Sequence, residues 1–435
     1  MRLIRLLKYD LAREADEWVK EKIIAPEQAA AICARYGVDY TNRSRQSYGY
    51  RVLMGLGYLF IGLALITLIG ANWDDIPRAA RMAGVVALAL GANLIGLYKY
   101  RTDQAPSAIG WFFLGGLFYG AAIMLIAQIY HIGEHFPDGI FWWGIGVLPI
   151  GILLESGLIL MLAAALGFTW FFVESSLNFY PALFPLFLAA IAWQLLRGRQ
   201  NLVLFLALIA GTVLFAEYTL SWFLSNGFGF NAGVENVVLG AGLFLAFHGL
   251  SKWLSAQTDH GSADYGALLD VWVLRFAIVT LFILSFDDPW EELITAEWRM
   301  PILAVALAVL LSGAAIWLAW RARASLVSTA TFSLLFLISL AAVVLTRNEY
   351  DAIAFQVVYN FVLVGTGIGL IVRGIRDDIS HYFFLGVLTI MGTGLFRYID
   401  LVGDYIGAAI LFAVLAAVLL FAAKFWRSHH GGATS

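Results

Sequence analysis

Polar side chains at the end of a long apolar stretch are the first residues of this chain that suggest chemistry. Gln128, Tyr130 and His131 close the apolar run 107–127. Gln128 and His131 are three residues apart and therefore share one face of a helix, and histidine changes charge near neutral pH. The spacing is compatible with a proton or substrate site, but side chains of this kind more often cap a helix end and bond to the neighbouring backbone. A metal site formed by His131, Glu134 and His135 is less well supported, because no firm third ligand stands in helical register.

A second group lies inside the apolar run 268–285, where Asp270 precedes Arg275 by five residues. An arginine deep in an apolar helix needs either a partner or a water-filled cavity. We expect a structural ion pair between Asp270 and Arg275. The alternative is that Arg275 faces an anionic ligand, which a guanidinium binds well.

A third group follows the apolar run 380–396, where Arg397 and Asp400 stand at positions i and i+3. Residues at this spacing meet on a helix surface, so we expect a structural ion pair. Arg78 and Arg81, which follow the first apolar run, are alternative partners for Asp400.

Apolar runs of lipid length must position these groups. Residues 52–71 contain no ionisable side chain, and about 20 residues of helix cross a hydrocarbon core roughly 30 Å thick. An open strand would leave its backbone amides unpaired in lipid, so the run must be helical. By the same criterion the chain contains about 14 spans. They are 52–71, 79–98, 107–127, 139–154, 157–173, 181–196, 201–218, 234–254, 268–285, 301–320, 326–345, 352–372, 380–396 and 404–424. Residues 139–173 are either two short helices with a turn at Glu155 or one broken helix.

Composition supports an all-α polytopic integral membrane bundle. Hydrophobic residues make up 61% of the 435 residues and charged residues 13%, whereas about a quarter of the residues in soluble domains are charged. The formal net charge of -3 and scattered basic residues argue against a nucleic-acid partner. The one cysteine excludes an intrachain disulfide and a multi-thiolate metal site.

Residues 1–47 form a small charged region before the first span, and they predict a helical hairpin. Apolar residues recur at helical spacing up to Val19, and Pro26 and Gly37 are start and stop signals for a second helix. Such a hairpin docks on the membrane surface or on a cytoplasmic protein partner, and the alternative is a structural element with no partner. Residues 48–427 then form the transmembrane domain and residues 428–435 a polar tail.

Basic residues predict how the chain is threaded. With the N-terminus inside, the inner loops carry more lysines and arginines than the outer loops, as the positive-inside rule requires. The inner residues are Lys99, Arg101, Arg197, Arg199, Lys252, Arg321, Arg323, Arg373, Arg376, Lys424 and Arg427, and the outer ones are Arg78, Arg81, Arg299, Arg347 and Arg397. We therefore expect a bacterial inner-membrane protein with both termini in the cytoplasm.

Two segments resemble a known family. Residues 71–81, with Asn72, Trp73 and Arg81, and residues 127–132 are similar to a prokaryotic polytopic membrane family, domain of unknown function 2157, over about residues 10–140. The resemblance implies an inner-membrane protein with no assigned activity. We infer that Trp73, Arg78, Arg81, Gln128, Tyr130 and His131 line one outward-facing vestibule.

Two classes of function fit these observations. The first is a secondary transporter or flippase-like protein for a small or lipid-linked substrate, with the vestibule residues and Arg275 as its candidate site. The second is a membrane scaffold or sensor whose N-terminal hairpin binds a partner. A membrane enzyme ranks third, with His131, Glu134 and Asp138 as its only candidate group. Walker, GxSxG and HExxH motifs are absent from the sequence, which leaves ATP-driven transport, lipase-type chemistry and zinc proteolysis without support, and we assign no catalytic residue and no cofactor.

Overall fold

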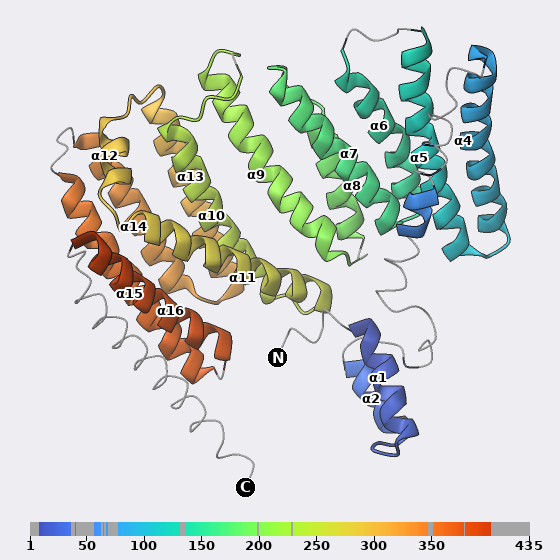
Figure 1. Cartoon of the computed structure of the whole chain (residues 1–435). Coiled ribbons are helices and arrows are strands. Elements are labelled where there is room, and N and C mark those ends of the chain that lie inside the picture. The colour runs from blue at the N-terminus through green and yellow to red at the C-terminus, as the bar shows by residue number, and fades with distance from the viewer. Residues whose placement is uncertain are drawn as a thin grey trace. The chain divides into compact units, whose positions relative to one another are not determined.

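The computed structural model describes residues 8–35, 40, 56–61, 64, 67, 77–130, 135–197, 200–227, 229–346, 351–377 and 379–401. Regular structure in these residues is helical throughout (Figure 1), which confirms the all-α fold. The helices are α1 (Lys8–Lys20), α2 (Pro26–Arg35), α4 (Arg78–Arg101), α5 (Ala105–Tyr130), α6 (Pro137–Leu153), α7 (Gly157–Ser176), α8 (Phe184–Leu196), α9 (Leu202–Leu224), α10 (Val234–Ser255), α11 (His260–Ile283), α12 (Asp288–Thr295), α13 (Pro301–Ala322), α14 (Leu326–Leu345), α15 (Ala352–Arg376) and α16 (Ser380–Leu401).

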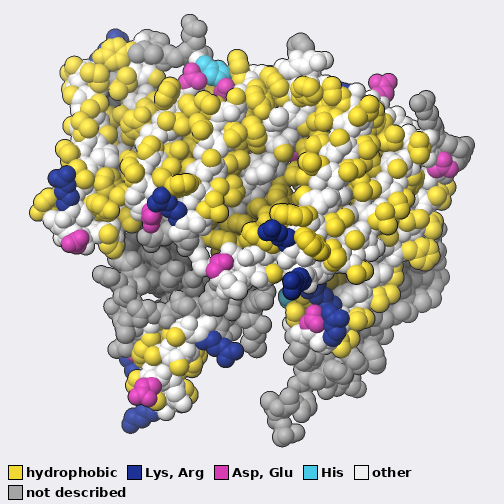
Figure 2. Space-filling view, turned by 180° about the vertical axis from the view of Figure 1, so that it is seen from behind, with side chains coloured by type: hydrophobic (Ala, Val, Ile, Leu, Met, Phe, Trp, Pro, Cys, Tyr) yellow, Lys and Arg dark blue, Asp and Glu magenta, His cyan; other side chains and the backbone are white. Residues whose placement is uncertain are grey.

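Nine helices among the described residues are long and apolar enough to cross a membrane, namely α4, α5, α7, α9, α10, α11, α13, α14 and α15. Helices α6 and α8 are apolar but shorter. Large apolar side chains such as Leu94, Leu310 and Phe361 are exposed on these helices. In Figure 2 most of the visible surface of the helices is apolar, as contact with lipid requires. The chain is therefore a multi-pass membrane protein.

Every predicted span from 79–98 to 380–396 corresponds to one helix of the structure. In the first predicted span, 52–71, the described residues are helical, and the last, 404–424, lies outside the described residues. The total of about 14 spans therefore remains a prediction. Helix α12, eight residues long, was not expected.

The alternative left open at residues 139–173 is resolved as two helices. Helix α6 ends at Leu153, and Glu155 adopts a left-handed conformation with φ of 47°. Ser156 then caps α7, since its Oγ accepts a hydrogen bond of 3.4 Å from the Ile159 amide. This turn keeps the two apolar runs as separate elements.

The chain divides into two compact units. Unit 1 comprises residues 1–236 and 254–267, and unit 2 comprises residues 237–253 and 268–435. In unit 1, helices α6 to α9 pack around an aromatic core that includes Phe171, Phe184 and Tyr218. In unit 2, helices α10, α13 and α14 pack together around apolar residues that include Ala308 and Leu340.

Small residues allow close helix packing in unit 2. A Cβ atom on Gly386 of α16 would lie 2.5 Å from the Gly367 carbonyl oxygen of α15. A Cβ atom on Gly249 of α10 would lie equally close, 2.5 Å, to the Ala315 carbonyl oxygen of α13. Glycine is thus needed at both positions for the backbones to approach each other.

Helices α1 and α2 pack against each other and form the helical pair expected in the N-terminal region. Their contact buries Ala12, Ala15, Ala29 and Cys33. Because burial disfavours the charged thiolate, it raises the pKa of the Cys33 thiol. The cytoplasmic location of this pair remains a prediction.

Replacing Gly386 by alanine is expected to destabilise unit 2. The added methyl group collides with backbone atoms of α15, and such overpacking costs about 1–3 kcal/mol. The measurement is the thermal unfolding midpoint in detergent, which should fall for Gly386→Ala. The matched control is Gly365→Ala on α15, where the added Cβ meets nothing within 4 Å. Equal midpoints for the two variants would contradict the close packing.

Cys33 is expected to react slowly with a maleimide at pH 8. Its raised pKa reduces the thiolate fraction at this pH, and burial blocks access to the sulfur. The rate should rise when the pH is increased or when the helical pair is opened by denaturant. The control is Ala31→Cys in a Cys33→Ala background, because Ala31 is exposed on the same helix. Similar rates at both positions would show that Cys33 is not buried.

Candidate functional site

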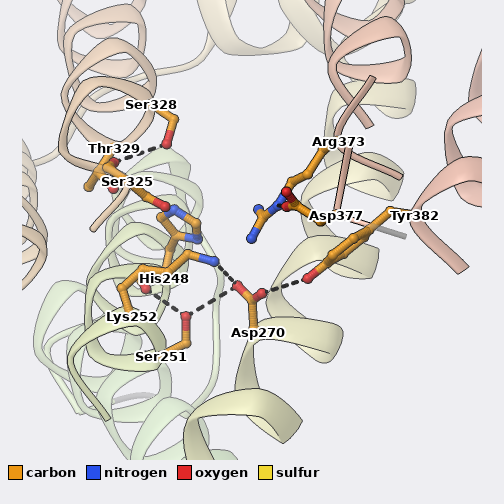
Figure 3. Close-up of polar contacts among 10 residues, drawn as sticks. All are labelled: His248, Ser251, Lys252, Asp270, Ser325, Ser328, Thr329, Arg373, Asp377 and Tyr382. Carbon is orange, nitrogen blue, oxygen red and sulfur yellow. Dashed lines mark hydrogen bonds and ion pairs between the residues drawn. The ribbon is translucent and has the colours of Figure 1, made fainter. Parts of the chain in front are cut away.

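A buried group of polar side chains in unit 2 joins the end of α10, the middle of α11 and the start of α16 (Figure 3). Lys252 comes from the last turn of α10, Asp270 from α11 and Tyr382 from the first turn of α16. We call these three residues, together with His248 and Ser251 of α10, the Asp270 cluster. Most of the sequence around them is apolar, so their position inside membrane helices needs an explanation.

The Asp270 carboxylate is the centre of this cluster. Lys252 Nζ forms an ion pair with Oδ1 of Asp270, and the Tyr382 hydroxyl donates to Oδ2 at 3.0 Å. The Ser251 hydroxyl lies 3.4 Å from Oδ1. The Lys252 side chain is only 8% exposed and that of Asp270 only 15%. Both charges have therefore lost most of their water, a cost that only mutual pairing and hydrogen bonds offset.

His248 lies one helical turn before Lys252, so both side chains are on the same face of α10. The Nε2 atom of His248 is buried and has no hydrogen-bond partner among the described residues. An unsatisfied buried polar atom costs roughly 1–3 kcal/mol. The Nε2 atom of His248 can therefore bind a proton, a water molecule or a ligand.

Arg373 of α15 reaches the same region from the other side. Its guanidinium lies 4.8 Å from the centroid of the Tyr382 ring, and its Nε atom lies 3.4 Å from the Asp377 carboxylate. In Figure 3 the guanidinium points into the space that separates it from Lys252. Asp377 follows the end of α15, and hydrogen bonds from Arg376 and Arg373 lower the pKa of its carboxyl. Arg373 is thus held in place without being buried.

The expected ion pair between Asp270 and Arg275 was wrong, because the partner of Asp270 is Lys252. Residues five apart on an α-helix are separated by about 140° around its axis, so Asp270 and Arg275 point in different directions. Arg275 is exposed, and its guanidinium lies 5.8 Å from the centroid of the Trp272 ring. Its role as a substrate residue remains a prediction.

The structure brings together part of the predicted outward-facing vestibule. The Tyr130 hydroxyl at the end of α5 lies 3.6 Å from the Met82 sulfur near the start of α4, so the two helix ends that carry the candidate residues are adjacent. Arg78 and Gln128 are exposed at these ends, and Arg81 is half-buried. Trp73 and His131 lie outside the described residues. A single site formed by all of them remains a prediction.

Arg397 belongs to another polar group of unit 2. Its Nε atom donates to the Asn360 side-chain oxygen at 3.1 Å, and its guanidinium lies 4.6 Å from the Phe286 ring centroid. The side chain of Asp400 lies outside the described residues, so the Arg397–Asp400 pair remains a prediction.

Sequence reasoning missed Lys252, Tyr382 and His248 as parts of one site. Lys252 counted only as an inner-loop charge. The signal that was available is the i, i+4 spacing of His248 and Lys252, which places both on one helix face. Within the described ranges, no three His, Cys, Asp or Glu side chains are arranged to hold a metal ion.

Comparison with known proteins covers only the first part of the chain. Residues 16–160 match the model of a family described as "Predicted membrane protein (DUF2157)". This match agrees with the family suggested by the sequence over residues 10–140. It includes α2 to α6, whereas Lys252, Asp270 and Tyr382 lie beyond it. No curated protein and no solved structure matches the chain.

Breaking the buried pair is expected to cost more than removing it. Lys252→Met leaves the Asp270 charge unpaired, and Asp270→Asn leaves Lys252 unpaired, each at about 3–5 kcal/mol. The double variant, Lys252→Met with Asp270→Asn, should therefore lose less stability than the sum of the two single variants. Unfolding in detergent measures all three.

The control is the exposed pair of Arg197 and Glu155, whose charged atoms are 3.8 Å apart with 55% and 32% of the side chains exposed. The same neutral substitutions, Arg197→Gln and Glu155→Gln, should couple by less than about 1 kcal/mol. If the double-mutant cycles for the two pairs gave the same coupling energy, Lys252 and Asp270 would not form a desolvated pair.

Proposed function

We propose that this chain is a secondary transporter or flippase-like protein in which the Asp270 cluster couples substrate movement to proton movement. The observation that carries the proposal is the ion pair of Lys252 and Asp270 inside two candidate membrane spans. Ionisable residues are costly at such positions, and in membrane proteins they mark substrate and proton pathways. The multi-pass helical fold supports the same class.

A proton can open this pair. While Asp270 is ionised, it holds Lys252 of α10 and the Tyr382 hydroxyl of α16. Protonation removes the charge that attracts Lys252 and leaves the ammonium group without a counter-ion. Because the residues come from three helices, a change of charge on Asp270 alters the contacts among α10, α11 and α16, and this links proton binding to helix movement.

Two further buried hydroxyl groups in unit 2 are candidates for hydration. The hydroxyl groups of Ser312 on α13 and Ser333 on α14 are buried and have no partner in the described part of the chain. In contrast, Thr389 and Thr393 donate to carbonyl oxygens four residues earlier on α16. Helices α13 and α14 pack against α10, which also carries His248. Water molecules would satisfy these atoms.

The positive-inside rule predicts how the Asp270 cluster is oriented in the membrane. Lys252, Arg373 and Arg376 belong to the predicted inner ends of their helices, so the Asp270 cluster lies toward the cytoplasm. We place the protein in a bacterial cytoplasmic membrane with both termini inside. The predicted vestibule around Arg81 and Tyr130 then lies on the opposite, outer side.

Proton movement through the purified protein tests the proposal. In proteoliposomes containing a pH-sensitive dye, an imposed pH gradient should decay faster with the unmodified protein than in empty vesicles. Asp270→Asn should remove at least about 90% of the added rate, because the amide cannot take up the proton. The control is Asp103→Asn in the turn after α4. A leak that is unaffected by Asp270→Asn, or no leak at all, would contradict proton coupling.

The second candidate function is a membrane scaffold or sensor whose N-terminal hairpin binds a cytoplasmic partner. The observation in its favour is that α1 and α2 share a small core formed by residues such as Ala15 and Cys33. Deletion of residues 1–47 distinguishes the two functions. A transporter should keep its proton flux without them, and a scaffold should show no flux while losing its cellular role.

A further inference from the structure

We propose that the Asp270 cluster and Arg373 together bind a phosphate group, which is carried by an anionic lipid headgroup or by a free phosphate. The inference rests on the proposed function, because it names the substrate class of the same site. Three observations support the inference. Lys252 and Tyr382 direct their donor groups at one carboxylate, positive charge exceeds negative charge around it, and the Nε2 atom of His248 has no partner among the described residues.

The donors of the site already surround an oxyanion. Lys252 Nζ and the Tyr382 hydroxyl reach the two different oxygens of the Asp270 carboxylate. A carboxylate and a phosphate present oxygens of similar charge and spacing to such donors. The Asp270 carboxylate thus shows where these donors would meet the oxygens of an anionic ligand.

Positive charge exceeds negative charge at this site. Lys252, Arg373 and Arg376 are the cations, and they pair with the carboxylates of Asp270 and Asp377. Three cations therefore stand against two carboxylates. A phosphate group balances the remaining positive charge, which a neutral substrate would not do.

The geometry assigns complementary roles to the basic side chains. Lys252 is a compact charge in a buried position, whereas Arg373 offers a planar guanidinium that matches phosphate oxygens. Its side chain is 40% exposed and is oriented by Asp377 and the Tyr382 ring. In Figure 3, Lys252 and Arg373 lie on opposite sides of the space above Asp270 and Tyr382. In the neutral tautomer that carries its hydrogen on Nε2, His248 is a further donor.

Two probes distinguish the sources of the phosphate group. Full-length protein in nanodiscs of zwitterionic lipid is titrated with inorganic phosphate at pH 5.5 and pH 7.5, with chloride as the competing anion. Separately, phosphatidic acid is compared with phosphatidylcholine for retention on the detergent-solubilised protein by native mass spectrometry. Saturable binding of inorganic phosphate identifies a free phosphate, and selective retention of phosphatidic acid alone identifies a lipid headgroup.

Arg373→Gln is the decisive variant, because Arg373 is partly exposed and its loss should leave the fold intact. We expect it to weaken binding of the effective probe at least tenfold, whereas Arg101→Gln at the end of α4 should change nothing. Asp270→Asn should strengthen binding several-fold, because the competing carboxylate is gone. Failure of both probes to bind, or equal binding by Arg373→Gln and the unmodified protein, would overturn the proposal.

The experiments distinguish failure of the phosphate site from failure of the proposed transport function. Proton flux that depends on Asp270 without binding of either probe rejects the phosphate site and retains transport. Binding that depends on Arg373 without proton flux rejects transport and retains the site.

Discussion

A solvent that offers no hydrogen bonds is the constraint on which the rest of this structure depends. Within lipid every backbone amide and carbonyl must find its partner inside the protein, and a helix meets that requirement within one segment. Apolar side chains then face the lipid, as Leu94 and Phe361 do. Association of the helices relies on close packing, and Gly386 and Gly249 allow it where backbones nearly touch.

The same constraint gives the Asp270 cluster its meaning. A charge inside such a bundle is costly unless an opposite charge and hydrogen bonds accompany it. Asp270 meets this condition through Lys252 and Tyr382, each on a different helix. Asp270 of α11 therefore links to α10 through an ion pair and to α16 through a hydrogen bond, and the ion pair requires an ionised Asp270. A stable contact that one proton can remove is a physical basis for coupling, and the unpartnered nitrogen of His248 lies on the same face of α10.

The helices of this chain could largely be predicted from the sequence, because long apolar runs in lipid permit one secondary structure. The helix break at Glu155 was left open, because both alternatives have the same hydropathy and a left-handed residue decides between them. Helix α12 was missed because eight residues give a weak periodic signal. The predicted partner of Asp270 was wrong because Arg275 is on the same helix, whereas the observed partner, Lys252, is on a different helix. Tertiary packing, which hydropathy does not encode, determines such pairs.

A structure of the full chain in lipid nanodiscs at high resolution tests the central claim most directly. The account predicts that Lys252 Nζ contacts the Asp270 carboxylate inside the lipid belt, with the Tyr382 hydroxyl on the second carboxylate oxygen. The contrary result is a Lys252 side chain that extends to the headgroups while Asp270 is solvated or bound to Arg275. In that case the buried pair, and the coupling inferred from it, would have to be abandoned.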